Sequence, residues 1–204
     1  MSSHHIIRDD QEPALFILEA EEGSNEAIGQ WLEWSPLVMI TEKSFHFAYA
    51  SQIKVDVMIC SHENEEVFKS LLQHQYPLTF ILSPSERFLQ AGLQYWGAKS
   101  ILVFTSVIQG LDQLLTTLAN LRPDGQCSLL TPDARWVYCP SGQYEKHFAG
   151  NSMIALHLNG AKQLIEGPEF KLSNKGEWTS QVTGTIRIKS LSPFWIKEPV
   201  SSNV

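Results

Sequence analysis

Short apolar runs alternate with amphipathic stretches from residue 14 to about residue 125, and this alternation leaves few possible architectures. The stretches between the runs place apolar residues on one helical face, as Ile28, Trp31 and Leu32 do. Strands that are apolar on both faces and alternate with helices are typical of a mostly parallel sheet covered on both sides. We therefore predict an α/β fold, Rossmann-like and with three layers, over residues 13–126. The expected strands are Ala14–Ala20, Leu37–Glu42, Val55–Ser61, Leu78–Leu82 and Ser100–Val107.

Capping and helix-breaking residues mark the expected helix ends. Ser24 or Asn25 is expected to cap the first helix. The tetrapeptide Ser83-Pro84-Ser85-Glu86 has the spacing of a capping box with proline at the first helical position. The helix that it opens is expected to run to Gly97, and a last leucine-rich helix is expected to end at Pro123.

The pattern changes after Gly125, where short runs are separated by Gly, Pro, Asn and Ser. Val182–Lys189 alternates apolar and polar residues, as a half-exposed strand does. We predict an antiparallel β-sandwich over residues 127–204, and a flexible tail over residues 1–12. The other expected strands are Ser128–Leu130, Trp136–Cys139, Met153–Leu158 and Lys162–Ile165.

Composition excludes several classes of function. The net charge is −7 and no basic run is present, so nucleic acid is not an expected partner. No apolar segment approaches the length that spans a bilayer, so no membrane association is expected. The three cysteines are too few and too irregularly spaced for a disulfide framework or a zinc site. They are interpreted as reduced thiols, and the expected localisation is cytoplasmic.

Ligands of parallel α/β sheets bind beyond the carboxyl ends of the strands. The residues that follow the predicted strands are therefore the first candidates for chemistry. They are Glu42-Lys43, Ser61–Glu63, Ser83–Glu86 and Ser106–Asp112.

The order of these elements, an α/β part followed by a sandwich, resembles the thiamine pyrophosphokinase family over nearly the whole chain. The clearest match is Ser173-Asn174, then the strand residues Thr185–Lys189, then Pro193-x-Trp195. Gly160-Ala161-Lys162 resembles the family's Gly-Leu-Lys. The resemblance implies transfer of pyrophosphate from ATP to thiamine, with Mg²⁺, giving thiamine pyrophosphate and AMP.

The resemblance also implies that Ser173, Asn174 and Trp195 bind thiamine at the interface of a homodimer. An indole face suits an electron-poor, partly cationic heterocycle. The alternatives are that Trp195 is a core residue and that Ser173-Asn174 is a plain turn. Further aromatic residues could bury the dimer interface or belong to the monomer core; they are Trp136, Trp178 and Phe194.

The family's acidic motifs correspond to altered residues in this chain. Its Asp-Gly-Gly corresponds to Glu42-Lys43-Ser44, and its Gly-Asp-x-Asp-Ser corresponds to residues 60–64. Its Asp-x-Thr-Asp corresponds to Ser83–Glu86, and its Gly-Gly-Arg-x-Asp to Ile108–Asp112. The resemblance therefore implies catalytic roles for Glu63, Glu86 and Asp112, with Glu63 and Glu86 as metal ligands. The implied nucleotide-binding residues are Glu42, Lys43, Ser61, Ser85 and Gln113.

Two hypotheses follow from these substitutions. In the first, the carboxylates form a shifted set that still holds Mg²⁺, and the chain is a divergent thiamine pyrophosphokinase. In the alternative, Glu86 completes the capping box, Glu63 favours a helix N-terminus, and Glu42 is solvated. The chain would then be an inactive relative that binds a thiamine-like ligand or only dimerises. A third possibility is a different acceptor alcohol.

Overall fold

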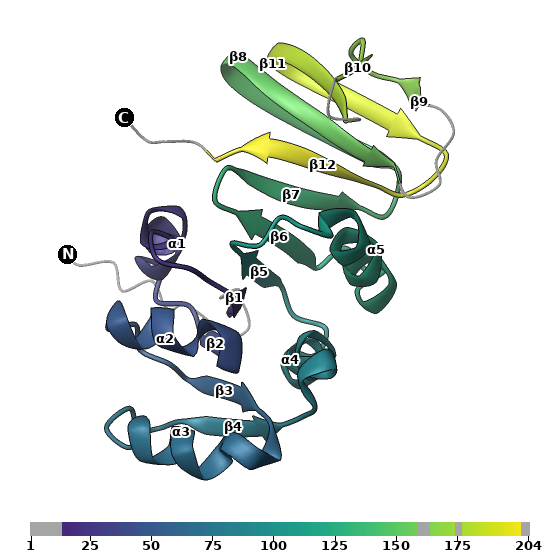
Figure 1. Cartoon of the computed structure of the whole chain (residues 1–204). Helices are drawn as coiled ribbons and strands as arrows, with labels where there is room; N and C mark the ends of the chain where they lie inside the picture. Colours follow the sequence, from purple (N-terminus) through teal and green to yellow (C-terminus); the bar gives the residue numbers. More distant parts are fainter. Residues whose placement is uncertain (1–13, 159–163, 174–176, 201–204) are drawn as a thin grey trace, which may run out of the picture. The chain divides into compact units, whose positions relative to one another are not determined.

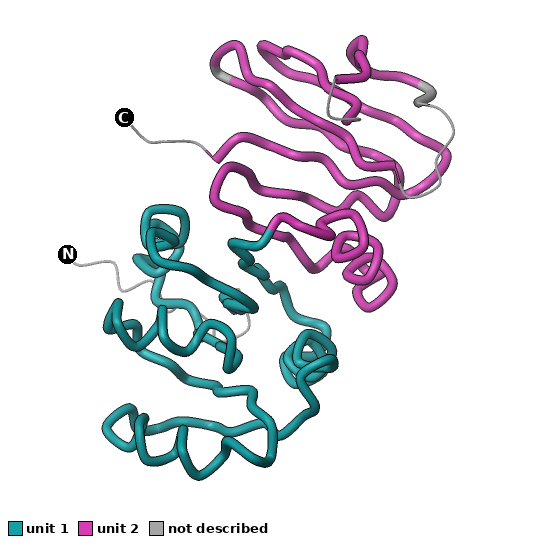
Figure 2. Tube along the Cα trace, in the orientation of Figure 1, with its two compact units in different colours: residues 1–107 teal, residues 108–204 magenta. Residues whose placement is uncertain are grey.

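The computed structural model describes residues 14–158, 164–173 and 177–200. The chain divides into two compact units, residues 1–107 (unit 1) and residues 108–204 (unit 2) (Figure 2). This division lies before the predicted domain boundary at residue 126, because the helix that follows residue 110 groups with the second unit. The predicted domain limits stay a prediction.

Unit 1 is built on a parallel β-sheet with the order β5-β1-β2-β3-β4. Strand β1 lies between β5 and β2, and its residue Leu15 pairs with Val38 on one side and with Leu102 on the other. The prediction of a parallel sheet is thereby confirmed. The strands are β1 (Ala14–Glu19), β2 (Val38–Thr41), β3 (Val57–Cys60), β4 (Thr79–Leu82) and β5 (Ile101–Thr105).

Helices cover both faces of this sheet (Figure 1). The chain moves in one direction from β1 to β4 and then returns to place β5 beside β1. Because parallel crossovers are right-handed, the first three connections lie on one face and the fourth lies on the other. The helices are α1 (Asn25–Leu32), α2 (Glu42–Ala50), α3 (Glu65–Leu71) and α4 (Phe88–Trp96), with short 3₁₀ turns η1 (His62–Asn64) and η2 (Ser85–Arg87).

Close packing of α4 on the sheet depends on Gly92. A Cβ atom at this position would lie 2.5 Å from Cε1 of Phe16 and 3.0 Å from Cδ1 of Ile59. Both of these side chains are fully buried. Glycine therefore lets the helix backbone approach β1 and β3.

Helix α2 was not predicted, and it carries the capping box of this unit. The hydroxyl of Thr41 accepts a hydrogen bond from the Lys43 amide, and the hydroxyl of Ser44 accepts one from the Thr41 amide. The capping box predicted at Ser83–Glu86 is wrong, because no side-chain capping bond forms there. Pro84 is extended and precedes a 3₁₀ turn, so α4 begins only at Phe88.

Unit 2 combines one helix with antiparallel strands in the order β10-β11-β8-β12-β7-β6, and β9 pairs with β11. Antiparallel strands lie at the predicted places, but β8 begins at Gln143 and not at the predicted Met153, and β10 and β12 are additional. The elements are α5 (Leu111–Leu121), β6 (Cys127–Thr131), β7 (Ala134–Cys139), β8 (Gln143–Leu158), β9 (Leu164–Glu166), β10 (Lys171–Leu172), β11 (Trp178–Ser190) and β12 (Phe194–Pro199).

The core of unit 2 is enclosed by the two long strands β8 and β11. Their register shifts between Val182 and Gly184, where glycine supplies a φ of 80°. Phe148 and Leu156, from opposite halves of β8, belong to one buried cluster with Ile196 of β12. One bent ladder thus surrounds the core, and a division into two stacked sheets stays a prediction.

No helix within the described residues is long and apolar enough to span a membrane. The longest of them, α5, has 11 residues.

Candidate functional site

The carboxyl edge of the sheet in unit 1 brings together the ends of β2 and β3. Glu42 begins α2 directly after β2, and Ser61 follows β3. One carboxylate oxygen of Glu42 accepts hydrogen bonds from the Ser61 amide at 2.5 Å and from the Ser61 hydroxyl at 2.8 Å. These two predicted nucleotide-binding residues therefore bind each other.

The pKa of Glu42 reflects this arrangement. Burial alone would raise the pKa, but the hydrogen bonds from the Ser61 amide and hydroxyl and from the Asn64 side chain lower it below its ordinary value. Glu42 is thus a carboxylate at neutral pH, and it is used to join two strand ends. The expectation that Glu42 is merely solvated is wrong.

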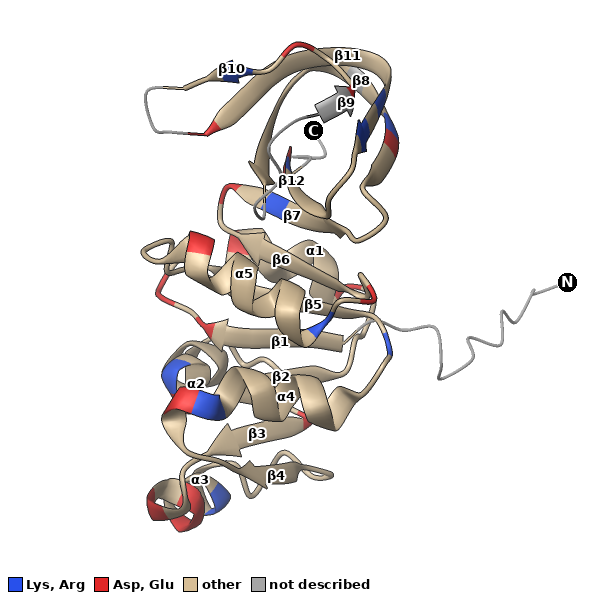
Figure 3. Ribbon diagram, turned by 90° about the vertical axis from the view of Figure 1, so that its right-hand side faces the viewer, with Lys and Arg blue, Asp and Glu red and all other residues tan. Residues whose placement is uncertain are grey.

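Lys43 lies beside Glu42 and pairs with Glu19 at the end of β1. The two charged atoms are 3.4 Å apart, and the Lys43 side chain is 54% exposed. Such an exposed pair is weak, so the ammonium group can exchange its partner for another anion. Sequence reasoning missed Glu19, which is the last residue but one of the first predicted strand and lies at the edge where ligands were expected. Figure 3 shows acidic and basic segments side by side at the start of α2.

The remaining catalytic and nucleotide-binding candidates of unit 1, Glu63, Ser85 and Glu86, are exposed. Glu63 lies in η1, while Ser85 and Glu86 lie in η2, where the hydroxyl of Ser85 is 3.5 Å from the Glu86 carboxylate. The described residues contain no group of three His, Cys, Asp or Glu side chains that could hold a metal ion. Mg²⁺ requires oxygen ligands in near-octahedral geometry. Because Mg²⁺ is commonly held by one or two carboxylates together with water and substrate phosphates, the roles of Glu63 and Glu86 as metal ligands stay a prediction.

In unit 2, Asp112 lies in the first turn of α5 and pairs with His157 of β8. The Asp112 carboxylate is 3.2 Å from Nδ1 of His157. The neighbouring Gln113 is exposed, and its carbonyl accepts a hydrogen bond from the Thr117 hydroxyl. Asp112 therefore contacts a residue that the sequence analysis did not select as a site residue.

The Asp112–His157 pair lies at a cavity of about 400 Å³ that is formed within unit 2. Three carboxylates and one lysine line this cavity. It is lined by Ile108, Gly110, Leu111, Asp112, Asp133, Trp136, Leu156, His157, Glu177 and Lys197.

Lys197 is already neutralised inside this cavity. Its ammonium group is 3.0 Å from the Asp133 carboxylate and 5.7 Å from the centre of the Trp136 ring. Burial would raise the pKa of Asp133, but hydrogen bonds from Lys197 and Thr131 lower it. The indole Nε1 of Trp136 is buried and, among the described residues, has no hydrogen-bond partner.

The residues predicted to bind thiamine do not all lie at this cavity. The Ser173 hydroxyl accepts a hydrogen bond from the Glu177 amide, so it helps to place Glu177, which lines the cavity. Trp195 is 0% exposed and its ring packs on Tyr138 with centroids 4.9 Å apart. In this chain Trp195 is therefore a core side chain, and its predicted contact with thiamine stays a prediction. Asn174 and Gly160-Ala161-Lys162 lie outside the described residues.

The aromatic residues predicted to lie in either the dimer interface or the core differ in how far they are buried. Trp136 and Phe194 are buried within unit 2, with exposures of 3% and 0%. Trp178 is 44% exposed, so it is the one of these three residues that a partner could contact.

Comparisons with known proteins find similarity in structure only. No protein-family model matches the sequence, and no curated protein does either. The thiamin pyrophosphokinase from Geobacillus thermodenitrificans has 11% identity and a TM-score of 0.64, with 93% of this chain and 99% of that chain covered. The enzyme from Bacillus subtilis has 10% identity and a TM-score of 0.63, with 92% and 99% covered. The yeast enzyme has 11% identity and a TM-score of 0.63, with 95% and 87% covered.

The parallel unit and the antiparallel unit place the chain in the class of mixed α/β proteins. More narrowly, its fold is that of the thiamine pyrophosphokinases, and the predicted resemblance to that family is confirmed at the level of the fold.

Proposed function

We propose that the protein is a binding protein on the thiamine pyrophosphokinase fold, which takes up thiamine or a similar cationic heterocycle and does not transfer pyrophosphate. The observation that carries this proposal is the cavity of unit 2, with its three carboxylates, one lysine and the Trp136 indole. ATP and Mg²⁺ are not required for such binding.

The charge of the cavity selects the class of ligand. Lys197 is paired with Asp133, so the carboxylates of Asp112 and Glu177 give the lining its net negative charge. A thiazolium-type cation is attracted by carboxylates and by an indole face. A ligand with phosphate groups would be repelled by the same charges, so thiamine is preferred to thiamine pyrophosphate.

The carboxyl edge of unit 1 supports the non-catalytic part of the proposal. Phosphoryl transfer is catalysed mainly by positioning and by metal ions that neutralise developing charge. Glu42 uses its carboxylate on Ser61, and Lys43 contacts Glu19. When bound, Mg²⁺ would have to be held by exposed side chains such as Glu63 and Glu86, for which no shared arrangement is present in the described part of the chain.

A second candidate function is the divergent thiamine pyrophosphokinase that the sequence predicts. It is favoured by the fold, which extends over 92–95% of the chain in the structures compared above, and by Lys43, whose exposed ion pair could yield to a phosphate. In this function the protein would be a homodimer that uses ATP and Mg²⁺ to convert thiamine into thiamine pyrophosphate and AMP.

Calorimetric titration of thiamine distinguishes the two functions. We expect thiamine to bind equally well with and without Mg²⁺ and a non-hydrolysable ATP analogue, and to bind more tightly than thiamine pyrophosphate. Glu177→Gln should weaken binding about tenfold, since a charge-assisted contact is lost. Glu169→Gln is the matched control, because Glu169 is an exposed carboxylate of unit 2 outside the cavity.

The same protein is then incubated with thiamine, ATP and Mg²⁺, and AMP is measured. AMP formation that is lost in Glu63→Gln would establish the second candidate and refute the first. Failure of thiamine to bind under any of these conditions would refute both.

A further inference from the structure

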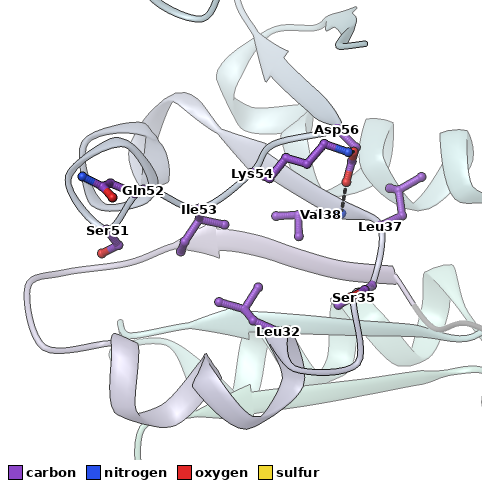
Figure 4. Close-up of a pocket in the computed structure, with 10 residues that line it drawn as sticks. Leu32, Ser35, Leu37, Val38, Ser51, Gln52, Ile53, Lys54 and Asp56 are labelled. Atoms are coloured by element: carbon purple, nitrogen blue, oxygen red, sulfur yellow. Dashed lines mark hydrogen bonds and ion pairs between the residues drawn. The ribbon is translucent and has the colours of Figure 1, made fainter. Parts of the chain in front are cut away.

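A second cavity lies in unit 1 at the amino edge of the sheet, opposite to the edge where the sequence places the chemistry. It has a volume of about 540 Å³ and lies where β2 begins and where the chain enters β3. Leu32, Val38 and Ile53 surround its apolar part, while Lys54 and Asp56 close one end (Figure 4). The other lining residues are Ser35, Pro36, Leu37, Ser51 and Gln52.

The charged end of this cavity is held in place by hydrogen bonds. One carboxylate oxygen of Asp56 accepts from the Val38 amide at 2.9 Å, and the other is 2.9 Å from the Lys54 ammonium group. The side chain of Gln75 accepts from the Val55 amide at 2.6 Å and so fixes the backbone between these two charges. Lys54 and Asp56 form an ion pair with each other, and the Lys54 side chain is 68% exposed, so this weak pair can open to a ligand that brings one charge of each sign.

Two lining residues have a backbone conformation that favours glycine. Ser35 and Gln52 have φ angles of 50° and 54°, and no other described non-glycine residue has a positive φ. Gln52 follows the C-terminal end of α2, where its amide donates to the Tyr49 carbonyl and the Ile53 amide donates to the Ala48 carbonyl. Glycine is the residue usually found at this position of a helix end. The chain thus keeps polar side chains on the cavity wall at a conformational cost.

Gln52 and Lys54 also line a neighbouring cavity, of about 580 Å³, together with Tyr49, His74, Gln75 and Tyr76. The two cavities therefore adjoin each other at Gln52 and Lys54. Polar side chains kept in a strained conformation at a cavity are more often found where a ligand binds than elsewhere.

We propose that the amino-edge cavity of unit 1 binds a small zwitterion with an aliphatic side chain, of the size and kind of a branched aliphatic amino acid. The ligand ammonium group pairs with Asp56, its carboxylate pairs with Lys54, and its side chain packs on Leu32, Val38 and Ile53. The balanced pair of charges favours a ligand without net charge, and the apolar wall favours an aliphatic body over a polar one.

The proposal is tested by titrating L-leucine into ¹⁵N-labelled protein and following the amide signals of Val38, Gln52 and Lys54. 4-Methylpentanoate and isoamylamine serve as comparison ligands, because each keeps the aliphatic body of leucine and only one of its two charges. We expect saturable shifts with L-leucine, and at least about tenfold weaker binding of either comparison ligand. The absence of saturable shifts up to about 10 mM, or equal binding of a singly charged ligand, would overturn the proposal.

Two variants separate binding from folding. Gln52→Gly should raise Tm by about 2–4 °C through relief of backbone strain, and should still weaken L-leucine binding, because it removes a polar side chain that lines the cavity. Lys54→Met should weaken L-leucine binding about tenfold, whereas the matched control Lys69→Met, which removes the paired lysine of α3, should leave it unchanged. Unchanged L-leucine binding in both cavity variants would also overturn the proposal.

Discussion

Removal of the Glu42 carboxylate should loosen the joint between the ends of β2 and β3. Glu42 accepts two short hydrogen bonds from Ser61 and is partly buried in the first turn of α2. A hydrogen bond to a charged group contributes about 1.5 kcal/mol or more. We therefore expect Glu42→Ala to lower the free energy of unfolding of unit 1 by about 3 kcal/mol. Glu42→Gln should cost about half as much, because its amide oxygen remains a neutral acceptor.

The effect should also depend on pH. The pKa of Glu42 is lower in the folded protein than in the unfolded chain, so its ionised form stabilises the fold. This stabilisation is fully present above the unfolded pKa and is lost as the pH falls through the folded pKa. The difference in stability between the wild-type protein and Glu42→Gln should therefore be largest at neutral pH and shrink under acidic conditions.

The assay follows the NMR signals of unit 1 in the whole protein, because a global unfolding curve would combine the stabilities of the two units. The pH at which the Ser61 amide signal shifts reports the ionisation of Glu42, and hydrogen exchange of this amide reports local opening. A midpoint at or above the ordinary pKa of glutamate, or unchanged exchange in Glu42→Ala, would refute the reasoning. Loss of Mg²⁺-dependent nucleotide binding without loss of stability would instead identify Glu42 as a ligand-binding residue.

Three further substitutions test the packing of the units. Gly92→Ala should destabilise unit 1 by about 1–3 kcal/mol in urea unfolding, because the new Cβ atom would overlap Phe16; an unchanged midpoint would contradict the close packing. Gly142→Ala should destabilise unit 2 by more than about 2 kcal/mol, since φ is 70° and the Cβ atom would lie 2.3 Å from the Ser190 carbonyl oxygen. Circular dichroism on heating measures the Tm of this variant, and a Tm equal to that of the wild-type protein would contradict the prediction. Glu198→Gln should cost about 2 kcal/mol in the same assay, because the buried carboxylate accepts from Tyr144 at 2.5 Å; a cost no larger than that of an exposed carboxylate would show that the bond is unimportant.

The strands of unit 1 could be predicted because they are buried on both faces and stand out as apolar runs. Helix α2 could not, because its capping box uses Ser44 where the common motif has glutamate or glutamine. The same motif misled at Ser83–Glu86, where Pro84 favours an extended backbone and the helix begins later. A capping pattern in a sequence thus indicates the start of a helix only when the backbone at that point can adopt helical angles.

The site at the carboxyl edge of unit 1 was predictable in position and not in partners. That Glu42 and Ser61 lie at one edge follows from parallel strands, whose carboxyl ends meet there. That they bind each other depends on the register of β2 against β3, which joins residues 19 positions apart. Likewise, the apolar run Phe194-Trp195-Ile196 indicates a strand covered on both faces, and all three side chains are buried, but the run does not identify the side chains that cover them. Long-range partners of this kind are fixed by tertiary packing and not by local pattern.

The position of β1 in the sheet has a consequence for synthesis of the chain. Of the strands in unit 1, β1 emerges first from the ribosome, yet one of its two neighbours, β5, ends only at Thr105. Until then, one edge of the apolar run from Ala14 to Ile17 has no β5 to cover it. Unpaired apolar edges are where nascent chains associate wrongly. Chaperone contact during translation should therefore be strongest before residue 105 and should fall once β5 has docked.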